Sequence, residues 1–337
     1  MAKMDIAIDI GTSFTSIFVS GNGIVLHEPS VIAYYDDGRK RSTRAVGGEA
    51  YYMMGKAPEK TKVICPVADG TISAPDACAD MLTEFIKMVL PQSYIIKPKI
   101  RAVLGVPTGL TVEERKTYEE VLMRAGVDEI TMVNNIMLAA IGIDLPVQSA
   151  FGGFIASLGG GIMEVAVLSL CGIVTGGSIN IGGDMIDRNL LDSIRGLYRL
   201  KIDRASVRKV KEQILSLIRN DCATATVSGI DIETKNIRTA TVHADKLFDA
   251  VHAYYKSMTD GIEGVINSCS PAVAAEIQRN GINLVGGGAN IPGLAATVGD
   301  KLGLRVNIPY SPQYATISGA GKLLSDPYLL DEICRRA

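Results

Sequence analysis

The sequence predicts an α/β fold, because short runs rich in Ile and Val alternate along the chain with stretches of helical periodicity. A second observation is an internal repeat. Residues 6–19, IAIDIGTSFTSIFV, align without a gap with residues 154–167, FIASLGGGIMEVAV, and each copy reads as strand, glycine turn, strand. Repetition of one such unit indicates two similar domains, each presenting a glycine turn to a shared cleft.

The composition is that of an ordinary folded protein without a strong electrostatic preference. The 337 residues are 47% hydrophobic and 21% charged, and the formal net charge is -2. Nucleic acid is therefore not an expected partner, since its phosphates attract strongly basic surfaces. No stretch approaches the roughly 18 uncharged apolar residues of a membrane span, and no signal-like segment opens the chain, so we expect a cytoplasmic protein.

The first copy of the repeat carries residues suited to hold a phosphate. Residues 6–11 read as a strand that leads into the turn DIGTSFTS. Backbone amides and hydroxyl groups of such a turn can donate to phosphate oxygens, and a carboxylate beside it can hold Mg²⁺ through water. The carboxylate is Asp9, and the donors come from Gly11, Thr12, Ser13 and Thr15. The alternative for Asp9 is a turn aspartate that accepts from backbone amides.

Two helices and a further strand follow in the first half. Residues 76–90 place apolar side chains on one helical face, and residues 101–107 read as a strand. Residues 111–126 begin with Thr111 and Glu114 at the spacing of a capping box and end at a glycine, which bounds a helix. The apolar stripes of both helices are most simply explained as core.

The second copy of the repeat has more glycine than the first but fewer polar side chains. Residues 159–161 are all glycine and leave room for a phosphate to approach the backbone. Ser157 stands where the first copy has Asp9, and apolar residues follow the glycines. Glu164 is then the ionisable group next to the turn and a candidate for orienting water. The alternative is a solvated strand residue.

Two further helices carry charged residues that suit a binding site. Residues 178–198 combine a glycine pair with two aspartates, Asp184 among them, near the start of a predicted helix, a position suited to capping or ligand binding. Residues 206–218 predict a helix whose apolar face turns away from Lys211 and Glu212. For these two charges the alternative is a solvated face.

A third glycine cluster lies at residues 283–303, NLVGGGANIPGLAATVGDKLG. It leaves a predicted strand and enters a predicted helix, with Pro292 expected in the first turn of that helix. Three glycine-lined turns can enclose one anionic ligand.

With these turns in this order, the sequence resembles the MreB-like bacterial actins of the actin superfamily. The similar segments, in shared order and spacing, are DIAIDIGTSFTSIFVSGNGIVLHEPSVIAY, PVADGTI, LGVPTGLTVEER, MLAAIGIDLPV, GGGIMEVAVLSLCGIVTGGSI, GGDMID and LVGGGANIPGL. The resemblance implies an actin-like, two-lobed ATPase fold with duplicated βαβ-type, ribonuclease-H-like cores and a nucleotide cleft between them. It places lobe I at 1–147 plus 314–337, with a small subdomain at about 33–66. It places lobe II at 148–313, with a small subdomain at about 182–250.

The resemblance also implies a nucleotide site for ATP and Mg²⁺. It assigns the first phosphate turn to Asp9, Gly11, Thr12, Ser13 and Thr15, and the second to Gly159, Gly160 and Gly161. It assigns adenosine binding to Gly183, Asp184, Lys211, Glu212, Gly286, Gly287, Gly288 and Ala289.

The positions expected to carry catalysis differ from the family pattern. MreB-like proteins usually have Glu-Glu-Pro where this chain has Asn134, Asn135 and Ile136, and the second glutamate is expected to polarise the attacking water. Asparagine can orient water but cannot accept its proton. Ser157 replaces the usual aspartate of the second turn, and Ile162 begins an apolar pair where two threonines are usual. We therefore expect ATP binding with slow or absent hydrolysis.

The function implied by the resemblance is a cytoskeletal filament. Such proteins polymerise with themselves, lie along the inner face of the cell membrane and organise cell shape together with cell-wall or shape-determining membrane proteins. Residues 91–99, PQSYIIKPK, fall where the family carries an apolar membrane loop. Tyr94, Ile95 and Ile96, beside basic residues, suit an interfacial anchor. The alternative is a loop tip folded onto its own core.

The sequence is also compatible with other classes of protein. A MamK-like filament that positions an organelle shares the fold, as does a pseudo-ATPase scaffold that copolymerises with a paralogous actin. A chaperone-type ATPase or a sugar kinase of the same superfold is a non-polymerising alternative. The first would need a substrate-binding domain after the nucleotide lobes and the second a carboxylate base facing a sugar pocket, and the sequence indicates neither.

Overall fold

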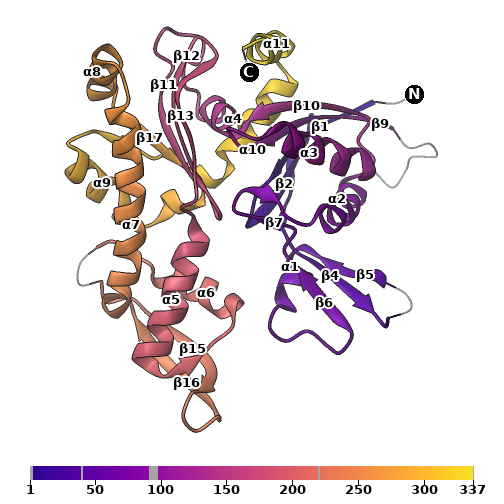
Figure 1. The fold of residues 1–337 in the computed structure, drawn as a ribbon, viewed down its shortest axis with the longest axis vertical. Helices are drawn as coiled ribbons and strands as arrows, with labels where there is room; N and C mark the ends of the chain where they lie inside the picture. Colours follow the sequence, from indigo (N-terminus) through magenta and orange to yellow (C-terminus); the bar gives the residue numbers. More distant parts are fainter. Residues whose placement is uncertain (1–2, 39–40, 91–97, 219–220, 337) are drawn as a thin grey trace.

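The computed structural model describes residues 3–38, 41–90, 98–218 and 221–336. The predicted membrane loop with Tyr94, Ile95 and Ile96 lies outside these residues. The described chain forms two halves side by side, each built around a five-stranded sheet (Figure 1). We refer to the half around the first sheet as lobe I and to the half around the second as lobe II.

The two large sheets repeat one topology, as the internal repeat predicts. The sheet of lobe I has the order β10 (Glu129–Asn134), β9 (Lys99–Val106), β1 (Lys3–Ile10), β2 (Phe14–Val19) and β3 (Gly23–Pro29). The sheet of lobe II has the order β18 (Val306–Asn307), β17 (Ile282–Val285), β11 (Gly153–Leu158), β12 (Met163–Ser169) and β13 (Gly172–Ile179). In each, the first strand pairs antiparallel with the second and parallel with a later strand. The duplicated cores are confirmed.

Helices cover the first sheet on both faces. On one face lie α2 (Pro75–Val89) and α3 (Val112–Arg124), whose apolar side chains share a core with β1 and β9. On the other face lie α4 (Asn135–Gly142), α10 (Ala315–Leu324) and α11 (Pro327–Cys334). Helix α3 has the predicted capping box, since Thr111 accepts from the Glu114 amide and Glu114 accepts from the Thr111 amide.

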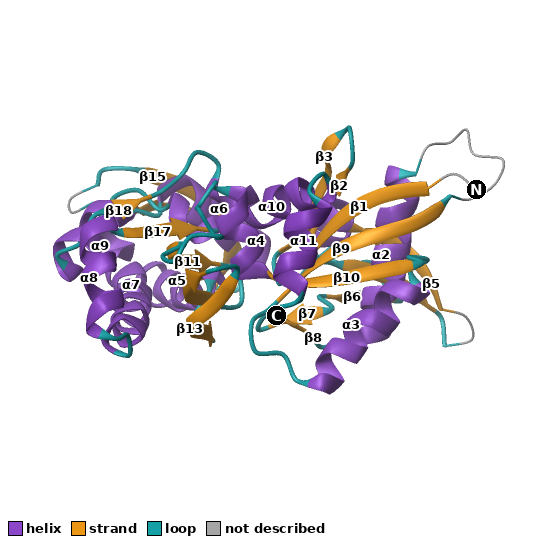
Figure 2. Ribbon diagram, turned by 90° about the horizontal axis from the view of Figure 1, so that it is seen from above, coloured by secondary structure: helices purple, strands orange, loops and turns teal. Residues whose placement is uncertain are grey.

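Helices α4 and α10 connect the two lobes (Figure 2). Their buried side chains form one cluster with Ala7 and Val103 of the first sheet and with Ile155 and Val285 of the second. The two helices touch at backbone distance: a Cβ on Gly319 would lie 1.8 Å from the carbonyl oxygen of Leu138. Only glycine permits this approach.

The sheet of lobe II has a separate hydrophobic core on the face opposite to α4 and α10. This core contains α5 (Gly183–Tyr198), α6 (Arg204–Ile214), α7 (Ala244–Asn267), α8 (Pro271–Asn280) and α9 (Leu294–Leu302). Two structural details differ from the sequence predictions. Pro292 precedes the N-cap of α9, Gly293, and so lies outside the first turn. Helix α6 ends at Ile214, although Leu217 beyond it is still buried in the same core.

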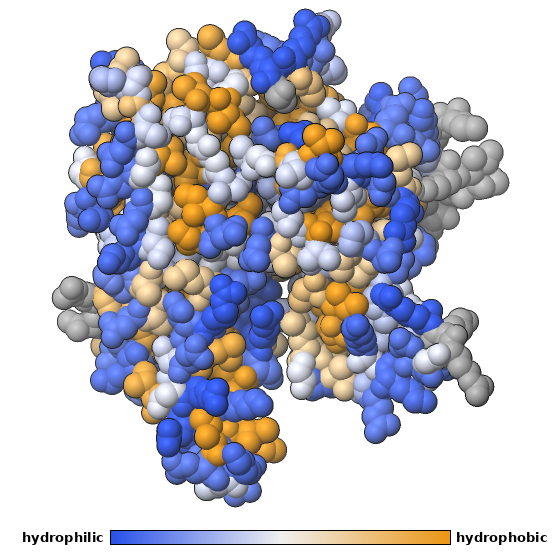
Figure 3. Space-filling model, in the orientation of Figure 1, coloured by the Kyte–Doolittle hydropathy of each residue, from blue (hydrophilic) through white to orange (hydrophobic). Residues whose placement is uncertain are grey.

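Each lobe also has small sheets, and the three-stranded ones form extensions on the two sides of the cleft (Figure 1). In lobe I they are β5 (Arg41–Val46), β4 (Ile32–Asp36) and β6 (Thr61–Ile64), with α1 (Gly47–Tyr52), and the pair β7 (Val67–Ala68) and β8 (Thr71–Ile72). In lobe II they are β14 (Leu200–Lys201), β15 (Thr224–Asp231) and β16 (Ile237–His243). A furrow separates these extensions in the space-filling view (Figure 3). Among the described residues, none of the helices is both long and apolar enough to cross a bilayer.

Candidate nucleotide site

A cavity of about 580 Å³ opens between the lobes, where the turns of both repeats meet. Most residues that the sequence assigned to nucleotide binding or to catalysis line it: Asp9, Gly11, Thr12, Ser13, Asn135, Gly159, Gly160, Gly161, Glu164, Gly183, Lys211, Glu212, Gly286, Gly287 and Gly288. Thr15, Asp184 and Ala289 are not part of the lining. The hydroxyl of Thr15 is fully buried and bonded to Ser30 Oγ at 2.9 Å, so it holds the turn from behind.

The two glycine turns approach each other so closely that side chains would not fit. A Cβ on Gly160 would lie 2.1 Å from Ser13 Oγ, and one on Gly161 would lie 2.5 Å from Thr12 Oγ1. Thr12 Oγ1 also accepts from the amide of Gly70 at 3.0 Å. The glycines of lobe II therefore bring the backbone against the hydroxyl groups of lobe I, which places donors from both lobes around one point.

Two carboxylates lie at this end of the cavity: Glu164 is buried and Asp9 is half-buried. Burial, and the nearby Glu164 charge, raise the pKa of Asp9 to about 7. Burial also raises the pKa of Glu164, although hydrogen bonds from Thr108 and Asn135 oppose that shift. Glu164 is 4% exposed, so the alternative of a solvated strand residue is wrong. The cause is the loop at Thr108, whose amide donates to Glu164 Oε1 at 2.8 Å across the lobe boundary.

Asn135, at the start of α4, lines the cavity beside Glu164. Its amide oxygen is buried and finds no hydrogen-bond partner among the described residues. A buried acceptor of this kind normally has a partner, so water or a ligand group is expected to donate to it. The side chain can orient such a group but cannot take its proton.

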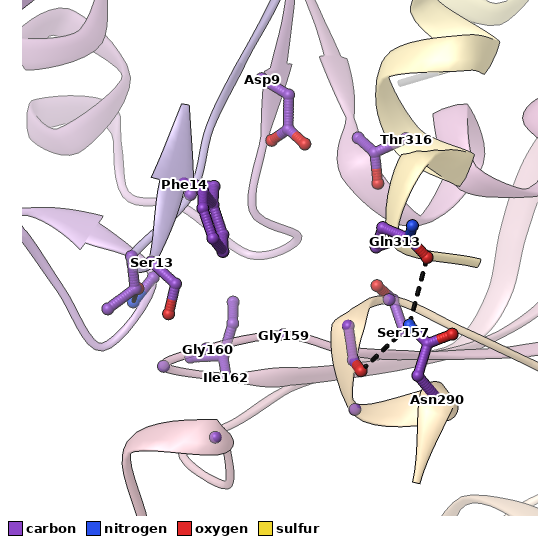
Figure 4. A pocket seen from close by; sticks show the side chains of 18 of the residues that line it. Asp9, Ser13, Phe14, Ser157, Gly159, Gly160, Ile162, Asn290, Gln313 and Thr316 are labelled. Atoms are coloured by element: carbon purple, nitrogen blue, oxygen red, sulfur yellow. Dashed lines mark hydrogen bonds between the residues drawn. The ribbon is translucent and has the colours of Figure 1, made fainter. Parts of the chain in front are cut away.

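Ser157 and Ile162 change the lobe II side of the cavity (Figure 4). Ser157 is the residue before the last of β11 and brings no negative charge to the cavity. Ile162 lies against Gly70 of lobe I, where a Cβ would come within 2.6 Å of Ile162 Cδ1. Its side chain therefore makes an apolar contact between the lobes and offers no donor to a phosphate.

The opposite end of the cavity is formed by α5 and α6. Lys211 Nζ lies 2.6 Å from Asp187 Oδ1, and both side chains are largely shielded from water. The alternative of a solvated face is therefore wrong for Lys211. Glu212 is more open and lies 3.4 Å from Arg208 Nε. Burial and the Asp187 charge raise the pKa of Asp184, which lies just behind the lining.

The third glycine cluster completes the wall. Gly286 has φ +83°, and a Cβ there would lie 2.5 Å from the carbonyl oxygen of Leu158. It packs the short helix η1 (Gly287–Asn290) against the end of β11. The side-chain amide of Asn290 then donates to Oε1 of Gln313, in η2 (Pro312–Tyr314), at 3.1 Å (Figure 4).

Sequence reasoning missed an aromatic group on the lobe I side. Phe14 stacks on His27 with 4.4 Å between ring centroids, and His27 meets Tyr314 edge-on at 5.0 Å. All three line the cavity. The Ser16–His27 register of β2 and β3 brings Phe14 beside His27, and Ser16 Oγ lies 2.9 Å from His27 Nδ1. Their separation in sequence left no local signal.

The residues present fit a nucleotide with Mg²⁺. The described residues contain no group of three or more His, Cys, Asp and Glu side chains able to hold a metal. Mg²⁺ is commonly bound by one or two carboxylates with ligand phosphates and waters, and Asp9 supplies such a carboxylate next to the glycine turns.

Duplicated sheets, a cleft between two lobes and a glycine turn from each repeat define the chain as an actin-like protein. The model of the MreB/Mbl protein family matches residues 3–332. The chain belongs to this family, which confirms the resemblance seen in the sequence.

Individual relatives cover almost the whole chain. The cell shape-determining protein MreB of Escherichia coli (strain K12) is 34% identical over 331 residues, 96% of this chain and 94% of that protein. The protein Mbl of Bacillus cereus is 31% identical over 338 residues, 100% of this chain and 99% of that protein. The crystal structure of MreB5 of Spiroplasma citri bound to ADP has a TM-score of 0.89 at 26% identity, covering 98% of both chains. A second structure of MreB5 is bound to AMPPNP.

Proposed function

We propose that this chain binds ATP with Mg²⁺ in the cleft between lobe I, residues 1–147 plus 314–337, and lobe II, residues 148–313. The observation that carries the proposal is the close approach of the all-glycine turn of lobe II to the hydroxyl groups of Thr12 and Ser13 in the turn of lobe I. The ADP and AMPPNP held by MreB5 support it, because that protein shares the fold over nearly the whole chain.

Different residues of the cavity bind different parts of the nucleotide. The turn amides and the hydroxyls of Thr12 and Ser13 donate to phosphate oxygens. Asp9 holds Mg²⁺ through water, and the metal offsets negative charge on the phosphates. Lys211 and Glu212 lie beside the adenosine end, where the Asp187 ion pair fixes the lysine.

We propose that hydrolysis is slow or absent. Asn135 can position a water but cannot accept its proton, and Glu164 is engaged by Thr108 and buried. Ser157 adds no charge for a metal, and Ile162 adds no donor for a phosphate. ATP then acts mainly as a ligand that favours one arrangement of the lobes.

We propose that the protein polymerises into filaments that organise cell shape, in the cytoplasm at the inner face of the cell membrane. Family membership supports self-assembly. The membrane contact is assigned to Tyr94, Ile95 and Ile96, and many copies along a filament would strengthen a weak single contact. Liposome co-sedimentation tests this point: equal recovery of the wild type and an Ile95→Ser, Ile96→Ser variant would remove it.

Sedimentation of the purified protein with Mg-ATP, with Mg-ADP and without nucleotide tests the central proposal. We expect pelleting that requires ATP. Equal pelleting in all three conditions would mean that the cleft does not control assembly, and the nucleotide role would then be wrong.

A second candidate is a pseudo-ATPase scaffold that copolymerises with a paralogous actin. The changes at Asn135, Ser157 and Ile162 favour it, since a scaffold does not need turnover. It predicts no pelleting alone under any condition, with recovery when a paralogue is added. A MamK-like role in organelle positioning remains a third candidate; the MamK double helical filament has a TM-score of 0.79 at 23% identity, which supports the fold alone.

A further inference from the structure

Arg208 of lobe II contacts aromatic rings of lobe I. It stands on α6, its side chain is 16% exposed, and it lines the cavity. Its guanidinium carbon lies 4.4 Å from the ring centroid of Phe14 and 5.2 Å from that of Tyr51. Phe14 begins β2 and Tyr51 belongs to α1, so one cation contacts two separate elements of the opposite lobe.

The aromatic partner of Arg208 is held in place from behind. Phe14 lies nearly parallel to His27, with an interplanar angle of 17°, and Tyr314 closes the row. Burial lowers the pKa of His27; the Glu28 charge opposes this shift, and the Arg208 charge adds to it. The lowered pKa favours the neutral imidazole, which suits a ring stacked beside a cation. A ring fixed on its far face loses little freedom when a guanidinium stacks on it.

A steric contact lies next to this cation contact. A Cβ on Gly55, shortly after α1, would lie 3.3 Å from the Cβ of Asp203, the N-cap of α6. The start of α6 therefore touches lobe I at two places. The other cavity-lining cation of α6, Lys211, is instead bonded within lobe II to Asp187 and contributes no such bridge.

We propose that Arg208, Phe14 and Tyr51 form a clamp across the mouth of the cleft that slows release of the bound nucleotide. The inference rests on the proposed nucleotide function. Because the cavity is walled by both lobes, a ligand leaves when the lobes separate, and separation breaks both Arg208 contacts. The clamp acts on the rate of opening and not on contacts with the phosphates.

Release of a fluorescent ATP analogue, chased with excess ATP in a stopped-flow instrument, tests the clamp. Arg208→Ala should release the analogue about tenfold faster, a change of the size expected for losing two such contacts. Arg208→Lys should fall between, since lysine keeps the charge but not the planar stack. Lys209→Ala is the matched control, because it removes a neighbouring exposed cation of the same helix and should leave release unchanged.

Phe14→Leu provides an independent variant that keeps apolar bulk at the turn. It should speed release, but less than Arg208→Ala does, because the Arg208–Tyr51 contact remains, and the double variant should be no faster than Arg208→Ala alone. Release within twofold of the wild type in Arg208→Ala would overturn the clamp. A matching loss of association rate would also overturn it, since Arg208 would then be a direct ligand contact.

Failure of the nucleotide proposal is distinguishable from failure of the clamp. If the wild type binds no analogue, the nucleotide function is wrong, and hydrogen exchange of the ligand-free protein decides the clamp. Faster exchange at the start of β2 and in α6 of Arg208→Ala, with Lys209→Ala unchanged, would support a bridge between the lobes. Unchanged exchange in both variants would refute it.

Discussion

Replacing Asp9 by asparagine should remove a pH dependence from the stability of the ligand-free protein. In the unfolded chain this carboxyl ionises near its ordinary pKa of 3.8, whereas burial and the Glu164 charge hold it protonated up to about pH 7 in the folded protein. Between these values the folded state binds one more proton than the unfolded state. The free energy of unfolding therefore falls as pH rises.

The size of the effect follows from the shift. Each unit of pKa is worth about 1.4 kcal/mol, so a shift of about three units corresponds to ~4 kcal/mol in total. This stabilisation is complete below the unfolded pKa and is lost once pH exceeds about 7. Between about pH 5 and about pH 8 the wild type should lose ~3 kcal/mol more than Asp9→Asn, because asparagine does not ionise. Glu164 titrates in the same direction in both proteins.

Urea unfolding at a series of pH values, in EDTA and without nucleotide, measures this difference. The comparison of wild type with Asp9→Asn isolates the one carboxyl, and Asp249→Asn, on the exposed side of α7, controls for loss of an aspartate. If the free energy of unfolding changed with pH by the same amount in wild type and Asp9→Asn across this range, the reasoning would be refuted. The Asp9 carboxylate would then be stabilised in the folded state by a partner that offsets its burial.

Three further changes have defined expectations. The double variant Ser157→Asp, Asn135→Glu should raise ATP turnover by about 10²- to 10⁴-fold and shorten filament lifetimes, measured by phosphate release and by light scattering; unchanged turnover would place the block elsewhere. Gly319→Ala should lower the free energy of unfolding in urea by about 1–3 kcal/mol, because its Cβ would meet a carbonyl oxygen of α4 at 1.8 Å. The control Gly196→Ala, with open space around it in α5, should be neutral or slightly stabilising. Thr111→Ala should cost about 1 kcal/mol in the same assay, since it removes the side-chain half of the α3 capping box, and an unchanged midpoint would contradict the cap.

The architecture was predictable because its signals are local and repeated. The duplicated strand, turn and strand located two adjacent strands in each large sheet, and the Thr111 and Glu114 spacing located the start of α3 within one residue. The boundary of α9 was less accurate. Pro292 suits a first helical turn by its fixed φ, but Gly293 takes φ +82° and so starts the helix one residue later.

The candidate site was predictable only where backbone geometry dictates sequence. Turn glycines can be recognised in the sequence, because these positions accept no other residue: any Cβ at Gly160 or Gly161 would collide with the opposite lobe. The state of a charged side chain depends on what covers it. Glu164 could be read as solvated because Thr108, which buries it, comes from a loop of the other lobe.

The same reasoning explains why Phe14 and Arg208 escaped notice. In sequence, Phe14 is an ordinary apolar residue of a strand and Arg208 a charge on the polar face of a helix. Their contact exists only because two lobes close on one cavity, and it lies at the place where those lobes must part. The residues that govern ligand entry and release are therefore those for which local pattern carries least information, since each acts through a partner on the opposite lobe.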